Sequence, residues 1–183
     1  MKKKILYTLL VLLIAFILFA VYTVNNPKSP LQTAVYSENG KEITITYSSP
    51  FKNGRLIFGS EADSALVLYD KYWRTGANRH TMLKTNSDLI FGNNTLPKGE
   101  YSLYSVPGNH TWDITFNSTN AYFGISQPDS EMDLFTISVP SSTIEESVEQ
   151  LTFDFISSNS ESSNLSTSIR LRWDLTEILI PFN

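Results

Sequence analysis

The sequence predicts an all-β protein: an antiparallel β-sandwich or jelly roll of about eight to ten strands, preceded by one N-terminal transmembrane helix. Two patterns indicate this class. Residues 5–24 contain no charged side chain, and after residue 30 apolar and polar residues alternate in short runs separated by Pro, Gly, Asn and Ser. The 183 residues, 42% of them hydrophobic, suffice for one core. The absence of cysteine excludes disulfides, iron–sulfur clusters, zinc–cysteine sites and a cysteine nucleophile.

The charge-free segment is long enough to cross a bilayer. About 20 helical residues with a rise of ~1.5 Å each span a hydrocarbon core of ~30 Å. Three lysines at positions 2–4 favour a cytoplasmic N-terminus. A cleaved signal peptide is the alternative, but it has an apolar region of only ~7–15 residues and a small-x-small cleavage site, whereas Leu18 lies two residues before Ala20. We therefore expect an uncleaved signal anchor and a single-pass membrane protein.

These features predict four parts of the chain. They are a cytoplasmic tail (1–4), the signal anchor (5–24), a tether (25–30) and an extracytoplasmic domain (31–183), in the periplasm or at the cell surface. Three of the 14 Lys and Arg residues precede the anchor and all 18 Asp and Glu residues follow it, so the exported part has a formal charge of −7. Because an acidic domain gains nothing from a phosphate backbone, we expect no nucleic-acid partner.

Strands are predicted along the exported part in order. Residues 42–47 alternate apolar and threonine side chains, which is typical of a half-buried strand. Residues 100–117 form a hairpin, because Pro97 and Gly99 favour a turn before it and Pro107–Asn109 favour one within it. Further strands are predicted at residues 134–139, 151–156 and 168–175.

Two further details of the strand pattern follow from alternation and capping. In the last strand, Ile169, Leu171, Trp173 and Leu175 are expected to face one way, toward the core. Residues 142–146, with Ser and Thr followed by Glu, form the one place where a short helix can be capped.

The densest group of polar and aromatic side chains lies in residues 69–81. This segment can form a recognition loop, because a guanidinium group binds carboxylates and aromatic rings supply apolar area. The structural alternative is that Gly76 permits a tight turn, Trp73 fills the core, and Arg74 or Asn78 hydrogen-bonds to loop carbonyls. The candidate residues within this segment are Trp73, Arg74, Asn78, Arg79 and His80.

No catalytic residue, metal ligand or cofactor is predicted. His80 and His110 are far apart in the chain, and the G-x-S-x-G, S-x-x-K and H-E-x-x-H motifs are missing from the sequence. Asp129, Glu131 and Asp133 offer oxygen ligands for calcium at alternate positions, but they lack the Gly and the later Glu of an EF-hand loop. We expect a solvated loop there.

Five strings occur in a characteristic order along the chain. Together they resemble a family of uncharacterised exported bacterial proteins, of a type common in Bacteroidota, which is known as a domain of unknown function. The resemblance covers about residues 29–181 and implies a β-rich extracytoplasmic domain without implying a reaction. The strings are I-T-I-T-Y-S-S-P at 43–50, G-R-L-I-F-G at 54–59, W-R-T-G-A-N at 73–78, L-P-K-G-E-Y-S-L at 96–103 and R-W-D at 172–174.

The chain departs from the family pattern at two places. Relatives usually carry an acidic residue after Gly-Ala-Asn, where this chain has Arg79. They usually carry Trp-Gly where this chain has Phe123 and Gly124. If the acidic residue serves a site in the family, that site is altered here.

The function that these observations favour is binding or assembly. The domain is expected to hold a protein partner, or an anionic or carbohydrate ligand, close to the membrane, through residues 73–81 with Arg55 and Arg172 beside them. One alternative is an exported hydrolase that uses His80 and a nearby carboxylate. Another is an accessory subunit of a membrane protein complex, with its helix packed on other membrane helices.

Overall fold

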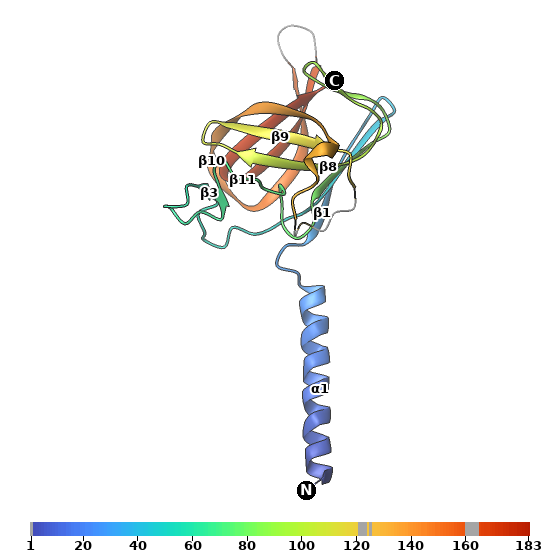
Figure 1. The fold of residues 1–183 in the computed structure, drawn as a ribbon, viewed down its shortest axis with the longest axis vertical. Helices are drawn as coiled ribbons and strands as arrows, with labels where there is room; N and C mark the ends of the chain where they lie inside the picture. The colour runs from blue at the N-terminus through green and yellow to red at the C-terminus, as the bar shows by residue number, and fades with distance from the viewer. Residues whose placement is uncertain (1, 121–123, 125, 160–164) are drawn as a thin grey trace.

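The computed structural model describes residues 2–120, 124, 126–159 and 165–183. One helix, α1 (Lys2–Asn25), leads into a β domain that contains every described strand and lies at one end of the helix (Figure 1). The domain is built almost wholly from strands, which confirms the all-β class predicted for it.

The segment predicted as an anchor is helical and bears exposed apolar side chains. Leu9 is 59% exposed, Phe16 66% and Phe19 65%. Because the exposed apolar residues follow one another along the chain at 100° steps, they cover every side of α1. Among the residues that the structure describes, no helix is both long enough and apolar enough to cross a membrane. The helix predicted over residues 5–24 is therefore confirmed, whereas the transmembrane span predicted for it is not.

Seven strands form one antiparallel sheet in the order β1-β2-β5-β8-β9-β10-β11. Two small sheets, β3 with β4 and β6 with β7, lie outside it, and a short 3-10 helix, η1 (Ser130–Met132), precedes β10. The strands are β1 (Leu31–Glu38), β2 (Lys41–Ser48), β3 (Phe58–Gly59), β4 (Val67–Leu68), β5 (Thr81–Thr85), β6 (Leu89–Phe91), β7 (Asn94–Leu96), β8 (Gly99–Pro107), β9 (Thr111–Asn117), β10 (Asp133–Asn159) and β11 (Leu165–Phe182).

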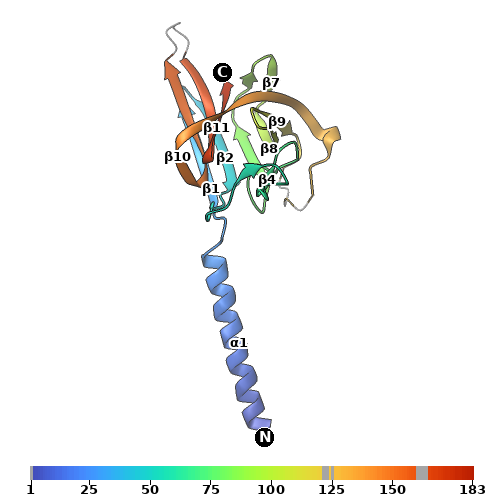
Figure 2. The ribbon, with the colours of Figure 1, turned by 90° about the vertical axis from the view of Figure 1, so that its left-hand side faces the viewer.

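The sheet curls because β10 takes part in it twice. Residues 133–140 pair with β9 and later residues pair with β11, with register shifts between Thr143 and Val148 and between Val148 and Thr152. Such irregularities bend a strand and increase its twist. In Figure 2, β10 accordingly arches from the side of β11 to the side of β8 and β9. β1 lies beside β10, so the two ends of the sheet approach one another.

Three details of the predicted architecture need correction. The predicted sandwich or jelly roll is one strongly curled sheet with two small additions, and its eleven described strands exceed the predicted eight to ten. Residues 142–146 belong to β10, in which Ser142 and Thr143 pair with Glu177 and Thr176 of β11, so no helix forms there. Leu175 is 43% exposed, because Asp174 adopts φ 54° and interrupts the alternation of β11.

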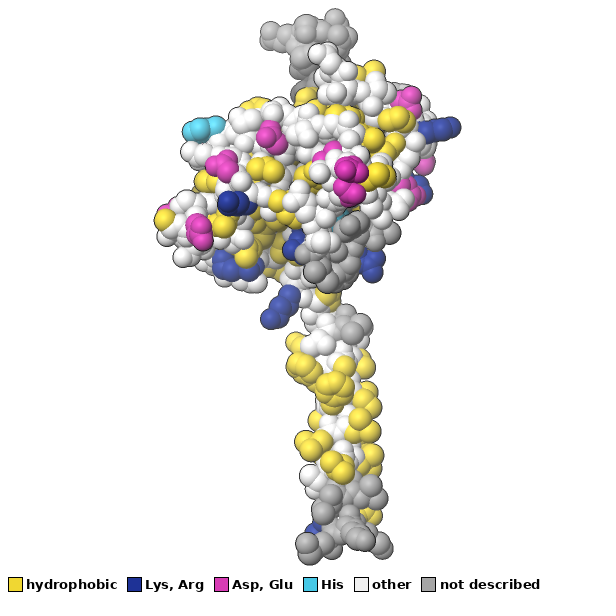
Figure 3. Space-filling view, viewed as in Figure 1, with side chains coloured by type: hydrophobic (Ala, Val, Ile, Leu, Met, Phe, Trp, Pro, Cys, Tyr) yellow, Lys and Arg dark blue, Asp and Glu magenta, His cyan; other side chains and the backbone are white. Residues whose placement is uncertain are grey.

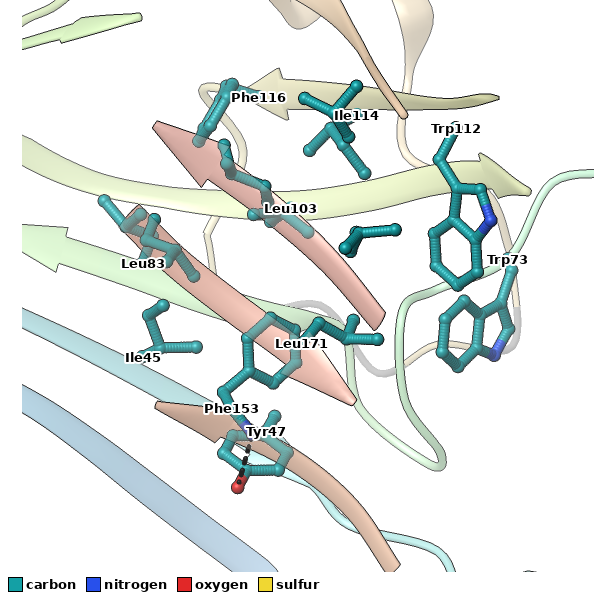
Figure 4. Packing of buried hydrophobic residues seen from close by; sticks show 14 of the residues in the cluster. Ile45, Tyr47, Trp73, Leu83, Leu103, Trp112, Ile114, Phe116, Phe153 and Leu171 are labelled. Atoms are coloured by element: carbon teal, nitrogen blue, oxygen red, sulfur yellow. Dashed lines mark hydrogen bonds between the residues drawn. The ribbon is translucent and has the colours of Figure 1, made fainter. Parts of the chain in front are cut away.

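The core fills the inside of the curl. Apolar residues from β2, β5, β8 and β9 meet those of β10 and β11, as Figure 4 shows for Leu83, Leu103, Ile114 and Leu171, all fully buried. A side chain also joins β2 to β10 across the curl, since the backbone N–H of Phe153 donates to the Tyr47 hydroxyl at 3.1 Å. The period-two pattern of these strands thus predicted the core correctly.

The L-P-K-G-E-Y string forms a tight structure at the start of β8. The Tyr101 hydroxyl donates to the Pro97 carbonyl at 2.8 Å, and the ring lies over Gly99. A Cβ at Gly99 would be 2.8 Å from the Tyr101 hydroxyl oxygen, which leaves no room for a side chain. These contacts fix the conformation of the chain where it enters the β8–β9 hairpin. The hairpin predicted over residues 100–117 is confirmed.

Removing the Tyr101 hydroxyl tests this role. Tyr101→Phe should lower the free energy of unfolding by about 0.5–1.5 kcal/mol, because the Pro97 carbonyl loses its intramolecular donor. Urea denaturation measures the change. The control is Tyr36→Phe, whose hydroxyl bonds the exposed Glu38, and which should cost less than about 0.5 kcal/mol. Equal losses in the two variants would contradict the interpretation.

Candidate functional site

A cleft of about 650 Å³ opens in the β domain where the chain arrives from α1. Its walls are the tether at Lys28, the turn 50–55, the start of β4, the loop 73–78 and Trp173 of β11. Of the described residues that line it, three are cationic and none is Asp or Glu. On the face seen in Figure 3, Lys and Arg side chains gather at the end of the domain nearest α1, whereas acidic side chains lie mainly toward the far end.

The loop 73–78 is fastened to β8. Trp73 and Ser105 exchange two backbone hydrogen bonds of 2.7 and 2.9 Å, and the Thr75 hydroxyl lies 2.9 Å from that of Ser105. The Trp73 indole N–H donates to the Gly76 carbonyl at 3.2 Å, which closes the loop on itself. Trp73 and Thr75 are buried, so these two residues of the W-R-T-G-A-N string have a structural role.

Gly76 lets the same loop pack against β2. A Cβ at Gly76 would lie 3.0 Å from the Ser48 carbonyl oxygen, to which the Ala77 N–H donates. Thr75 and Asn78 take φ values of 54° and 57°, a left-handed conformation that is uncommon without glycine. Because the buried residues fix these dihedrals, the side chains between them are held at the cleft.

Arg55 is held in the turn 50–55, another part of the cleft wall. Its Nε donates to the Lys52 carbonyl at 2.9 Å and its Nη2 to the Phe51 carbonyl at 2.5 Å. Lys52 in turn pairs with Asp174 at the interruption of β11, at 2.5 Å. The turn that carries Arg55 is therefore tied to the main sheet through an ion pair whose two side chains are mostly covered.

The structure brings together four of the seven predicted site residues. Arg55, Trp73, Arg74 and Asn78 line the cleft. Arg79 is exposed and is not part of the lining. The interpretation of Trp73 as a core residue is also confirmed, so Trp73 serves both the core and the cleft wall.

Arg172 lies elsewhere, on the opposite face of β11 from Trp173. Its Nη2 contacts the Asp154 carboxylate at 3.1 Å, beside Arg170, which binds the same carboxylate with two hydrogen bonds of 2.7 and 2.6 Å. Since successive strand residues point to opposite faces, Trp173 in the cleft wall places Arg172 away from it. The structure therefore does not bring Arg172 to the cleft.

His80 is buried behind the loop and is not among the lining residues. Its Nε2 lies 3.2 Å from the Tyr72 hydroxyl and 3.2 Å from the Ser126 carbonyl oxygen. Burial lowers the pKa of His80, the hydrogen bond to Ser126 opposes that shift, and the charge of Arg74 adds to it. The hydrolase hypothesis requires His80 to lie in a pocket, within reach of a carboxylate or a hydroxyl. The Tyr72 hydroxyl is within reach, but His80 does not line the cleft.

The acidic residues 129–133 do not form a solvated loop throughout. Asp133 accepts hydrogen bonds from the Tyr104 hydroxyl at 2.6 Å and from Asn117 at 2.8 Å. Burial, followed by the bond to Asp133, raises the pKa of Tyr104 to about 12. In the described parts of the chain, no group of three His, Cys, Asp or Glu side chains could hold a metal ion. Asp133 thus anchors the start of β10 to β8 and β9.

Sequence reasoning missed several residues of the cleft, among them Lys28, Phe51 and Asn53. Lys28 was assigned only to the tether, and Phe51 and Asn53 fall in a turn without a periodic pattern. The Asn53-Gly54 pair is a turn signal that could have marked the site, and both residues take positive φ values, 49° and 69°.

The fold and site define a class: an all-β domain on a single curled antiparallel sheet, with a cationic cleft at the end that adjoins an apolar helix. Residues 29–182 match the family described as a protein of unknown function, DUF2911, and the chain belongs to that family. No curated protein and no solved structure matches it. The resemblance to a domain of unknown function is confirmed, whereas the link to Bacteroidota stays a prediction.

The burial of His80 predicts a pH-dependent stability. Because the folded-state pKa lies below the ordinary value of about 6.5, the unfolded chain takes up the proton first as the pH falls. Stability is complete above pH ~6.5 and declines below it, by at most ~1.4 kcal/mol per pH unit for one proton. His80→Gln should flatten the dependence of the melting temperature on pH between neutral and mildly acid solution, whereas His110→Gln should not.

Proposed function

We propose that this protein is an extracytoplasmic binding module that takes a negatively charged ligand, or a negatively charged group of a partner, in the cleft beside α1. The observation that carries the proposal is the charge of the lining. Lys28, Arg55 and Arg74 face a space without carboxylates in a chain whose formal net charge is −4. Such a local reversal of charge favours anions over cations.

The remaining lining gives the ligand a second property. Phe51, Leu66, Val67 and Trp73 form apolar walls, and Asn53 and Asn78 place amide groups at the rim. Ligand sites typically combine an apolar wall with a few polar groups that fix orientation. The module is therefore suited to an anion attached to an apolar or ring-shaped group.

Attachment to a membrane surface is part of the proposal. The apolar side chains around α1 have no cover within the described chain, and exposed apolar surface of this extent usually contacts lipid or another protein. We propose lipid as the cover. Lys28 follows the end of α1 by three residues, which span at most ~11 Å. The cleft would accordingly lie close to the membrane surface.

Small probes that differ in charge test the cleft. Benzoate should bind the full-length protein in a neutral detergent, and benzyl alcohol, which has the ring without the charge, should bind at least tenfold more weakly. Arg74→Ala should reduce benzoate affinity about tenfold or more, because a hydrogen bond to a charged group contributes about 1.5–3 kcal/mol. Calorimetric titration measures the affinities.

The matched control is Arg79→Ala, which removes the same charge five residues farther on, outside the cleft. It should leave benzoate affinity within about twofold, and both variants should melt near the wild-type temperature. A large loss of stability in Arg74→Ala would return Arg74 to a structural role. Equal losses of affinity in the two variants would contradict a localised site.

The location is tested separately. The full-length chain should sediment with membranes and resist extraction at alkaline pH, and a chain that lacks residues 2–25 should be released. A protease added outside intact spheroplasts should digest the β domain. Protection of the domain until the cells are lysed would place it in the cytosol and contradict the proposed topology.

A further inference from the structure

We propose that the anionic group received by the cleft is a phosphate monoester. This inference rests on the proposed function and adds the chemical class of the ligand. A phosphate monoester carries about −1.5 to −2 charges at neutral pH, whereas a carboxylate carries one. Attraction to the three cationic side chains of the lining grows with the charge of the ligand, since no lining carboxylate opposes it.

The two arginines of the cleft are suited to such an oxyanion. Arg55 uses Nε and Nη2 on the carbonyls of Lys52 and Phe51, so its side chain is fixed before a ligand arrives. A guanidinium group has five N–H donors, and the others stay available. Arg74 also lines the cleft, and no described residue accepts a hydrogen bond from its guanidinium group. The planar donors of arginine match phosphate oxygens in pairs.

Gly124 is a positioning residue for Arg74. Its N–H donates to the Asn78 carbonyl at 2.8 Å, which brings its Cα against the arginine stem. A Cβ at this position would lie 2.8 Å from Arg74 Cδ and 3.2 Å from Arg74 Nε. The Asn78 carbonyl oxygen would be only 2.9 Å away, so the loop backbone as well as the Arg74 side chain has to shift. A methyl group at position 124 would therefore displace Arg74.

Phosphate monoesters reach such a site from two sources. One is a phospholipid headgroup, because the tether at Lys28 forms part of the cleft and leads directly to α1. The other is a soluble phosphorylated metabolite. Phosphatidic acid in the detergent micelle and glycerol 3-phosphate in solution present the same chemical group and distinguish the two sources.

The test compares phenyl phosphate with benzoate, which share a ring and differ in the anion. Calorimetric titration of the full-length protein in a neutral detergent, above the second phosphate pKa of about 6, should show phenyl phosphate binding at least tenfold more tightly. Arg74→Ala and Gly124→Ala should each weaken it tenfold or more, and Arg79→Ala less than twofold. Melting temperatures measured in parallel identify any variant that fails to fold.

A double variant tests whether Gly124 acts through Arg74. If it does, Arg74→Ala combined with Gly124→Ala should bind phenyl phosphate no more weakly than Arg74→Ala alone. Additive losses would overturn the positioning role. Benzoate binding as tightly as phenyl phosphate, with both lost in Arg74→Ala, would overturn the phosphate assignment and leave the binding function intact. If neither probe binds, the proposed function fails as well.

Discussion

A cluster of four aromatic side chains joins the core of this protein to its cleft. The Phe58 ring lies 4.8 Å from Trp112 and 5.6 Å from Trp73, both edge-on, and Trp73 stacks on Trp173 at 6.1 Å (Figure 4 shows Trp73 beside Trp112). The four rings come from β3, the loop before β5, β9 and β11. Large aromatic surfaces dominate the energetics of such contacts. The loop that carries Arg74 can keep its conformation because one side of it is part of the core.

The arginines of this protein differ in whether carboxylates lie beside them. On the outer face of β10 and β11, Asp154 is shared by Arg170 and Arg172, and Glu177 lies 3.8 Å from Arg170. The neighbouring carboxylates neutralise the charge of these two arginines. In the cleft, by contrast, the turn at Arg55 and the loop at Arg74 present cations without carboxylates. Arginine is therefore paired with carboxylates on the outer face of β10 and β11, whereas the lining of the cleft holds arginines and no carboxylate.

The strands with strict alternation were the most predictable part of the fold. Ile43, Ile45, Leu171 and Trp173 are buried as their period of two predicted, because a strand with one wet face must bury the other. The curl of the sheet was not predictable in this way. It depends on the long β10 and its irregular pairing, and residues 142–146 have a local composition that also suits a helix.

The candidate site shows the same division. The local string W-R-T-G-A-N marked the loop at residues 73–78, because tight turns and buried indoles need particular residues close together in the chain. No local sequence pattern could show that Arg55 and Lys28 line the same cleft while Arg172 lies outside it. That outcome depends on which strand faces point together once the sheet has curled. Composition and periodicity thus establish an apolar N-terminal helix, a cysteine-free β domain and an acidic surface. Long-range packing alone brings the cations of the cleft together, because the convergence of distant segments is a property of the folded chain.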